Sequence, residues 1–482
     1  MAHKPATSFA DWDRSDKYHN SYLIQKDDSL EANIKNSVAK GLPDIAISAA
    51  QGQFLNLLAK TIGAKRILEV GTLGGYSTTW LAKALPEEGE LLTFELKEFH
   101  AQVATENLTK SGVVSKVKIV VGPASESLAK VPSEPKFDLA FIDADKASIL
   151  QYFTEAKRLV RPGGIIIVDN VVRNGRVADP SYSDENVDGV RRLLAALPKD
   201  NGVEAITMGT VGEKGYDGFF LLWSTSFPAL FRVMEGKKST NLPLGSSKAM
   251  ATFPATTYTD WARSDQYHRS FLMPKDDVLH AALQNSDAHG LRTEISVNAA
   301  LGKFLNLLAR SIGAKRILEI GTLAGYSTIS LARALPKDGK VISLELHELH
   351  AKVASENIAL ADLTSQVEII VGPALKTLAR FPTELKFDLI FIDADKPPMT
   401  EYFAEAKRLI KQGGVIILDN VVLNGDVAKE HLPDTLSDYD KEKVKGIRRL
   451  LNSIKGDDEV DATTISTADE KGYDGFMYVI RK

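Results

Sequence analysis

The sequence predicts an α/β fold present twice, as two tandem doubly wound domains, and three observations predict it. The chain has 482 residues, which is too long for one typical hydrophobic core. Its first half recurs in its second, for example as GAKRILEVGTLGGYST at 63–78 and GAKRILEIGTLAGYST at 313–328. Within each half, short apolar runs alternate with longer amphipathic stretches, a pattern typical of βαβ units around a parallel sheet.

The internal repeat covers almost the whole chain. FIDADK occurs at 141–146 and 391–396, and KGYDGF occurs at 214–219 and 471–476. The offset between the copies is 250 residues for the first motif (391 − 141) and 257 for the second (471 − 214). The extra residues of the second copy fall in polar loops, which is where complete domains tolerate insertions.

We therefore expect one domain at 1–223, a linker at 224–257 and a second domain at 258–482. The linker segment is rich in Ser, Thr, Pro, Gly and Lys, as flexible connections are. Within it, the apolar run FPALFRVM (227–234) is expected to form a short helix.

Seven runs of the first copy are strand candidates because they are short and rich in apolar or β-branched residues. In chain order they are RILEV (66–70), LLTFE (91–95), KVKIVV (116–121), FDLAFID (137–143), GIIIVD (164–169), VEAITM (203–208) and GFFLLW (218–223). The stretches YSTTWLAKAL (76–85) and LQYFTEAKRLV (150–160) have the apolar periodicity of helices.

The first five strand candidates all end in residues suited to ligand binding. In the first copy these are the glycine turn Gly71–Gly75, Glu95, Gly122-Pro123-Ala124, Asp143, and Asp169-Asn170. In the second copy they are Gly321, Glu345, Gly372-Pro373-Ala374, Asp393, and Asp419-Asn420. Open α/β sheets bind ligands at the carboxyl ends of their strands, so the sequence predicts one ligand site in each copy.

The glycine turn and the acid after it indicate a nucleoside. A glycine turn lets the backbone approach a ligand, and an acid that ends the second strand suits ribose hydroxyls. The alternatives are a tight strand-to-helix turn and a surface glutamate. Gly74 is replaced by Ala324 in the second copy, so only Gly71 and Gly75, with their counterparts, can be required. The spacing differs from the Gly-x-Gly-x-x-Gly of dinucleotide-binding proteins.

Asp143, Asp169 and Asn170 offer three oxygen donors, a set that suits a hard cation such as Mg²⁺. The alternative is that both aspartates cap helices or loops. Lys146 follows Asp143 by three residues, and a neighbouring cation would favour the neutral, proton-accepting amine. An ordinary surface lysine is the alternative for Lys146. We expect structural roles for His19, His100, His268 and His350.

Composition excludes several classes of function. The net charge of −4 gives no reason to expect nucleic acid or an anionic membrane as a partner. The sequence lacks an apolar run long enough for a membrane span and an N-terminal signal peptide. It contains no cysteine, so disulfides, thiolate metal ligands and a cysteine nucleophile are excluded. The cytoplasm is the expected compartment.

At LEVGTLGGYST, FIDADK and VDN the chain resembles the class I S-adenosylmethionine-dependent O-methyltransferases, in particular the cation-dependent catechol and caffeoyl-coenzyme A O-methyltransferases. The resemblance covers nearly all of both copies. It implies a seven-stranded sheet whose last strand is antiparallel. It implies cofactor contacts at Glu69, Gly71, Ser77, Glu95, Ala124 and Asp143 and, in copy two, Glu319, Gly321, Ser327, Glu345, Ala374 and Asp393. It implies Mg²⁺ ligands at Asp143, Asp169, Asn170, Asp393, Asp419 and Asn420, and general bases at Lys146 and Lys396.

The chain departs from the family at two places. The polar Gln51, on a stretch that resembles the family's cofactor-side helix, becomes Leu301 in the second copy. The family often has a tryptophan beside the aromatic acceptor, two residues after Asp-Asn-Val; here that position is Arg173 in copy one and Leu423 in copy two. The two copies are therefore free to prefer different acceptors.

The expected function is methylation of a hydroxyl on a small catechol-like or other vicinal-diol acceptor, with S-adenosylmethionine, Mg²⁺ and a site in each half. Two alternatives remain: one active half beside a cofactor-binding scaffold half, and an NAD-dependent oxidoreductase. Family members commonly pair as homodimers, so the tandem is expected to fold as an intramolecular pseudo-dimer. Further association of whole chains is compatible with this expectation.

Overall fold

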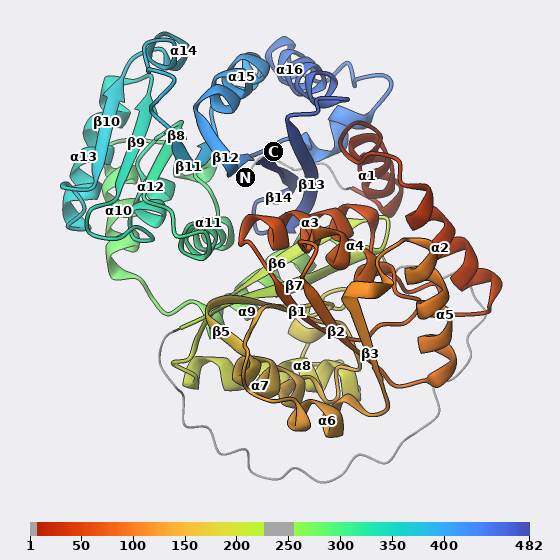
Figure 1. The fold of residues 1–482 in the computed structure, drawn as a ribbon. Coiled ribbons are helices and arrows are strands. Elements are labelled where there is room, and N and C mark those ends of the chain that lie inside the picture. Colours follow the sequence, from red (N-terminus) through yellow and green to blue (C-terminus); the bar gives the residue numbers. More distant parts are fainter. Residues whose placement is uncertain (1–6, 226–254) are drawn as a thin grey trace.

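The structure is a computed structural model that describes residues 7–225 and 255–482 (Figure 1). Most of the expected linker, including FPALFRVM, lies outside the described residues. Over these two ranges, every helix is too short or too polar to cross a lipid bilayer.

Helices and strands of the first half alternate in the predicted order. Its helices are α1 (Phe9–Leu23), α2 (Asp28–Ala39), α3 (Ala49–Thr61), α4 (Tyr76–Ala84), α5 (Glu98–Lys110), α6 (Ala124–Ser127), α7 (Ile149–Leu159) and α8 (Glu185–Ala196), with 3-10 helices η1 (Val114–Lys116), η2 (Leu128–Lys130), η3 (Arg176–Ala178) and η4 (Leu197–Lys199). Its strands are β1 (Arg66–Val70), β2 (Glu90–Glu95), β3 (Val117–Val121), β4 (Phe137–Ile142), β5 (Val160–Val168), β6 (Val203–Gly212) and β7 (Gly215–Ser224).

The second half repeats this arrangement. Its helices are α9 (Tyr258–Leu272), α10 (Asp277–Ala288), α11 (Ala299–Ser311), α12 (Tyr326–Ala332), α13 (Glu348–Leu360), α14 (Ala374–Leu378), α15 (Met399–Leu409) and α16 (Asp438–Ile454), with 3-10 helices η5 (Thr293–Ile295) and η6 (Leu423–Ala428). Its strands are β8 (Arg316–Ile320), β9 (Lys340–Glu345), β10 (Val367–Val371), β11 (Phe387–Ile392), β12 (Ile410–Leu418), β13 (Val460–Asp469) and β14 (Gly472–Arg481).

Each half contributes seven strands to the sheet, as the sequence predicts. Their order is β3-β2-β1-β4-β5-β7-β6 in the first half and β10-β9-β8-β11-β12-β14-β13 in the second. Strands β1 to β5 pair in parallel, whereas β7 runs antiparallel to both β5 and β6. The last strand of the second half, β14, is likewise antiparallel to β12 and β13. The predicted mostly parallel sheet with an antiparallel last strand is confirmed.

Helices cover both faces of each sheet because alternate strand residues point to opposite sides. Leu68, Ala140 and Ile166 join one core, which includes side chains of α7 and α8. Ile67, Leu139 and Ile165 join the other, which includes side chains of α3 and α4. A strand buried on both faces must be apolar at nearly every position, which explains the apolar run 139–142 of β4.

The two halves meet at one sheet edge and exchange their N-terminal helices. Strands β6 and β13 pair antiparallel at Thr210 and Thr467, which joins all the strands into one fourteen-stranded sheet. Helix α1 lies against β13 and α16 of the second half, as Figure 1 shows, and also against η6. Helix α9 in turn lies against β6, α8 and η3 of the first half.

These contacts between the halves are reciprocal. The His19 ring lies 3.0 Å (Nδ1 to Oγ1) from Thr464, and the His268 ring lies 2.9 Å from Thr207 in the same way. Between the two helices, the rings of Trp12 and Trp261 lie 5.9 Å apart. Both histidines are almost fully buried. The surface by which each half meets the other is therefore nearly the same surface.

The buried histidines predict a loss of stability at acidic pH. Burial lowers the pKa of His19 to about 4 and that of His268 to about 3, below the ordinary value of 6.5. Below pH 6.5 the unfolded chain binds protons that the folded chain does not, so stability falls as pH falls; the loss levels off below about 4 for His19 and below about 3 for His268. We expect each ring to contribute on the order of 3 kcal/mol to this loss.

The measurement is the urea midpoint of the wild type and of His19→Asn, at pH 7.5 and pH 5. Burial raises the pKa of Asp16 from 3.8 to about 7, so between these values the folded chain keeps a proton that the unfolded chain has lost. The contribution of Asp16 to stability therefore falls as pH rises from about 4 to about 7, which is opposite in sign to the histidine contribution. Comparing the variant with the wild type cancels this second contribution. An equal loss of stability in both proteins would contradict the prediction.

Candidate functional site

The polar strand ends lie along one edge of each half's sheet. In the first half β1 lies between β2 and β4, and β5 follows β4. The register pairs Val70 with Ile142 and Ile142 with Val168. The residues that follow these positions therefore leave the sheet at the same level and meet there. The second half has the same register.

Gly71 is required by the backbone of the neighbouring strand. Its φ is 104°, and a Cβ atom placed on it would lie 2.1 Å from the carbonyl oxygen of Asp143. Gly321 has the same geometry against Asp393, at the same distance. The glycine thus allows the turn after β1 to lie directly against the loop that carries the aspartate and lysine.

Glu69 is buried beneath this turn and accepts three hydroxyl hydrogen bonds. Ser77, Thr78 and Thr93 donate to it, at 2.7, 2.6 and 2.7 Å. Burial raises the pKa of Glu69 to about 7, and the hydroxyls partly oppose this shift. Glu319 has a pKa raised to about 7 for the same reason and accepts from Thr328 and Ser343.

Glu95 connects the glycine turn to the loop after β2. Its carboxylate accepts the backbone N–H of Leu73 (2.8 Å) and of Lys97 (3.0 Å) and lies 3.2 Å from Nδ1 of His100. Glu345 makes the matching contacts with Leu323, His347 and His350. His100 and His350, for which the sequence predicts structural roles, contact an acid of the candidate site. Ala124 lies nearby in the fold as the first residue of α6 and is buried.

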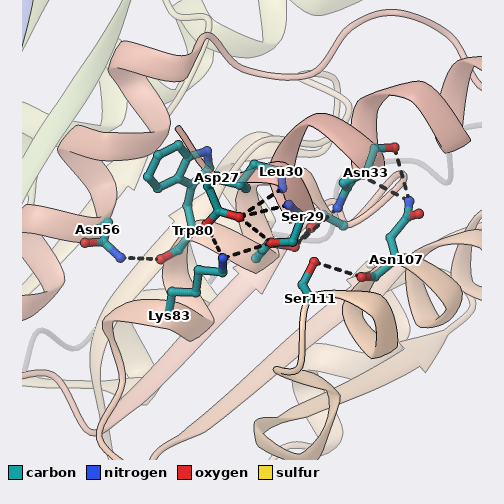
Figure 2. Close-up of polar contacts among 11 residues, drawn as sticks. Asp27, Ser29, Leu30, Asn33, Asn56, Trp80, Lys83, Asn107 and Ser111 are labelled. Atoms are coloured by element: carbon teal, nitrogen blue, oxygen red, sulfur yellow. Dashed lines mark hydrogen bonds and ion pairs between the residues drawn. The ribbon is translucent and has the colours of Figure 1, made fainter. Parts of the chain in front are cut away.

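Polar contacts fasten the helices around the glycine turn. Figure 2 shows Lys83 of α4 against Asp27 and Ser29 at the start of α2, and Asn107 of α5 against Asn33 of α2. The amide of Asn107 also donates to the carbonyl oxygen of Gly74, at 2.8 Å. In the second half Asn357 donates to the carbonyl oxygen of Ala324 in the same way.

Asp143, Lys146 and Asp169 form the chemical centre of the edge. Lys146 is only 3% exposed, and its Nζ donates to Oδ1 of Asp143 at 3.0 Å. Asp169 is also buried, and burial, followed by the negative charge of Asp143, raises its pKa to about 8. In the second half Lys396 donates to Asp393 at 3.2 Å. The pKa of Asp419 there is raised well above its usual value by the same two causes.

This donor set fits a hard divalent cation. Asp169 is buried and the neighbouring Asp143 is half-buried. Their like charges repel each other, and a cation between them would remove that cost. The amide oxygen of Asn170 supplies a third oxygen donor, and Mg²⁺ commonly takes few protein ligands. Within residues 7–225 and 255–482, no group of three or more His, Cys, Asp or Glu side chains is arranged to hold a metal. The cluster of Asp143, Asp169 and Asn170 contains only two acids.

Asp217 was missed by sequence reasoning and holds the loop after Asn170. Its Oδ1 accepts the backbone N–H groups of Val172 (2.9 Å), Arg173 (2.8 Å) and Gly218 (2.9 Å). Asp474 makes the same three contacts in the second half. The signal was present in the sequence, because both residues are the aspartate of the repeated KGYDGF motif.

Gly189 was also missed and allows the lysine loop to contact helix α8. A Cβ atom placed on Gly189 would lie 1.8 Å from the carbonyl oxygen of Lys146. At Gly446 of α16 the distance to the carbonyl oxygen of Lys396 would be 2.1 Å. Each lysine is therefore positioned by a glycine in the middle of a helix.

Replacing Asp217 by Ala is expected to disorder the loop that follows Asn170. The change leaves three backbone N–H groups without their acceptor, and one such lost partner costs about 1–3 kcal/mol. We expect lower activity of the first half together with a lower urea midpoint. Asp217→Asn retains an acceptor oxygen and serves as the control, so it should recover most of both losses. Equal losses for the two variants would show that charge, and not the acceptor, is what matters.

The two copies differ beside their buried aspartates. The Gln51 side chain lies within hydrogen-bonding reach of Asp169 and acts to lower its pKa. Its counterpart Leu301 is buried and apolar. The loops differ as well, since Arg173 of the first half corresponds to Leu423 of the second, and both side chains are half-buried.

Comparison with known proteins identifies the family. The model of the family described as O-methyltransferase matches residues 19–222 and, a second time, residues 273–478. This chain belongs to the O-methyltransferase family. The reaction class predicted from the sequence, S-adenosylmethionine-dependent transfer of a methyl group to oxygen, is confirmed. The oxidoreductase alternative is thereby excluded.

Two curated relatives and one solved structure each match a little less than half of this O-methyltransferase. Catechol O-methyltransferase from Mycobacterium tuberculosis is 45% identical over 206 residues, which are 43% of this chain and 93% of that protein. Catechol O-methyltransferase from Niastella koreensis is 44% identical over 208 residues, 43% of this chain and 94% of that protein. The structure of an O-methyltransferase from Bacillus cereus in complex with SAH is 42% identical, covers 45% of this chain and all of that one, and has a TM-score of 0.44.

Proposed function

We propose that this O-methyltransferase methylates one hydroxyl of a catechol-like or other vicinal-diol acceptor, with a divalent cation and with a site in each half. The observation that carries the proposal is the hydrogen bond from the buried Lys146 to Asp143, beside the buried Asp169, with the same arrangement around Lys396. Two relatives named catechol O-methyltransferase support the acceptor class.

In this proposal the methyl donor lies over the glycine turn. Glu95 is the acid that would receive the ribose hydroxyls, and Ala124 would face the adenine. Glu69 and Ser77 lie at the turn itself and would shape the floor of the donor site. In the second half the corresponding residues are Glu319, Gly321, Ser327, Glu345 and Ala374.

The acceptor would lie beside Asp143, Asp169 and Asn170, which would hold Mg²⁺. When bound, the cation would supply Lewis-acid stabilisation of the acceptor oxyanion. Lys146 is close enough to this centre to take the hydroxyl proton, because its Nζ donates directly to Asp143. The deprotonated oxygen then forms the new bond to the methyl carbon, the bond from that carbon to sulfur breaks, and S-adenosylhomocysteine leaves.

Chelation tests the cation. We expect exhaustive treatment with EDTA to abolish methylation of catechol by labelled S-adenosylmethionine, and added Mg²⁺ to restore it. The control variant Lys130→Met, which removes an exposed lysine elsewhere, should respond to EDTA in the same way as the wild type. Full activity after chelation would contradict the metal half of the proposal. Methylation of simple phenols but of no vicinal diol would contradict the acceptor class.

One active half beside a scaffold half is a second candidate. The observation that favours it is Leu301, because the second half lacks the polar side chain that lies beside Asp169 in the first. Both lysines, both pairs of acids and both asparagines are nevertheless present across the two halves. Inactivating each half separately distinguishes the two candidates.

The arrangement of the chain forms part of the proposal. We propose that residues 1–223 and 258–482 are the two methyltransferase units, joined by 224–257, and that they associate as the two subunits of a dimer would. The reciprocal histidine and tryptophan contacts support this. We propose the cytoplasm as the compartment on the basis of the cysteine-free composition.

A further inference from the structure

The loop that follows the candidate metal ligands differs in charge between the two halves. We call residues 169–179 the first acceptor loop and residues 419–429 the second acceptor loop. Position by position, Arg173 corresponds to Leu423, Arg176 to Asp426, and Asp179 to Lys429. Two cationic side chains of the first loop thus become one apolar and one anionic side chain in the second.

The backbone of the two loops is nearly the same, so the difference lies in the side chains alone. Arg173 has a φ of 54° and Leu423 a φ of 52°, both in the left-handed region. Asp217 and Asp474 hold the two loops by the same backbone hydrogen bonds. The side chains of Arg173 and Leu423 therefore leave equivalent backbone positions in the two halves.

Within the described residues, the cations of the first loop have no carboxylate hydrogen-bonded to them, whereas the cation of the second loop is paired. The Nε of Arg173 is buried there without a hydrogen-bond partner. Arg176 stacks its guanidinium on the ring of Tyr182, 4.9 Å from the ring centre, and donates to the Tyr182 hydroxyl at 3.5 Å. In the second loop Lys429 forms an ion pair with Asp426 at 2.7 Å.

The acids near Arg173 are already occupied. The positive charge of Arg173 acts to lower the pKa of both Asp184 and Asp217. Asp217 accepts three backbone N–H groups, and Asp184 caps helix α8 by accepting the N–H of Val187 at 2.7 Å. Arg173 is thus a half-buried guanidinium to which no carboxylate of the described residues is hydrogen-bonded, on a loop that Asp217 holds in place. Such a group is suited to an external anion.

We propose that the first site selects acceptors that carry an anionic group, recognised by Arg173. The second site, with Leu423 and an internally paired loop, selects uncharged acceptors. This inference rests on the proposed function, since it concerns the acceptor of the same two sites. The whole chain would then methylate both a carboxylated and an uncharged vicinal diol, each in its own half.

The test measures kcat/KM for catechol and for 3,4-dihydroxybenzoate in full-length chains that retain one proposed base. Lys396→Met leaves the first site and Lys146→Met leaves the second. We expect the ratio of kcat/KM for 3,4-dihydroxybenzoate to kcat/KM for catechol to be at least about tenfold higher at the first site than at the second. A tenfold difference lies within what one charge-assisted hydrogen bond contributes. Added salt should reduce this difference, because half-exposed charges are screened.

Exchange of the loop residues completes the test. In the Lys396→Met chain, Arg173→Leu should lower the ratio about tenfold, and in the Lys146→Met chain, Leu423→Arg should raise it. Each change installs the residue that the other half already has at the same backbone geometry, so misfolding is not expected. Lys130→Leu removes an exposed charge elsewhere and is the matched control. Equal ratios at both sites would overturn this inference alone. No turnover of either diol would overturn the proposed function as well.

Discussion

Replacing both Lys146 and Lys396 by methionine is expected to lower methyl transfer to catechol by about 10²–10⁴-fold, which is the usual contribution of a positioned general base. Methionine has a length similar to that of lysine and can fill the same buried space without the amine. Lys146 is 3% and Lys396 6% exposed, so neither acts as an ordinary surface cation. Binding of S-adenosylmethionine, measured by calorimetry, should change little because the lysines are assigned to the acceptor.

The single variants then report on each half. If both sites methylate catechol, each single variant retains a substantial part of the activity and only the double variant loses it. If one half is a scaffold, one single variant is as inactive as the double variant and the other resembles the wild type. Lys130→Met is the matched control for the loss of a lysine. Full activity in the double variant would contradict the role of both lysines.

Replacing Gly71 by Ala is expected to remove donor binding from the first half. The new Cβ would overlap the backbone of Asp143, and a φ of 104° costs a residue with a side chain about 1–3 kcal/mol on its own. Both the turn and the aspartate loop must then move apart. In a chain with two donor sites, we expect the calorimetric stoichiometry for S-adenosylmethionine to fall from two to one.

Gly74→Ala is the matched control for this prediction. Its Cβ would meet chiefly the end of the Ser37 side chain, and the second half carries Ala324 at the same position. A far smaller effect is therefore expected. The reciprocal variant Gly321→Ala should remove the other donor site, because its geometry against Asp393 is the same. Undiminished stoichiometry in Gly71→Ala would contradict the assignment of the turn.

The fold could be predicted because its signals are local and repeated. Each buried strand is a short apolar run, and each polar residue at a strand end follows from parallel strands that share one edge. Asp143, Lys146 and Asp169 meet where that rule places them. This rule predicts where the polar residues at the strand ends lie, but not which side chains contact them. It therefore does not predict the contact of His100 with Glu95.

Contacts that depend on distant parts of the chain could not be predicted. Asp217 lies 47 residues beyond Asn170 (217 − 170), and only the hairpin of β6 and β7 brings it back to the loop. Gly189 looks like an ordinary small residue within α8 until the lysine loop is placed against that helix. The exchange of α1 and α9 depends on the packing of two whole halves and leaves no local pattern in either.

Because α1 and α9 are exchanged, the covalent connection between the halves determines how many first and second halves each assembled pair contains. Because each half offers nearly the same surface to the other, two first halves in solution would find the same partner surface as a first and a second half do. Separate halves would then form pairs of two first halves, pairs of two second halves and mixed pairs. The number of first acceptor loops per second acceptor loop would differ from pair to pair. A single chain raises the effective concentration of the unlike partner and fixes the ratio at one to one. Every molecule thus carries one loop with two arginines and one loop with an internal ion pair.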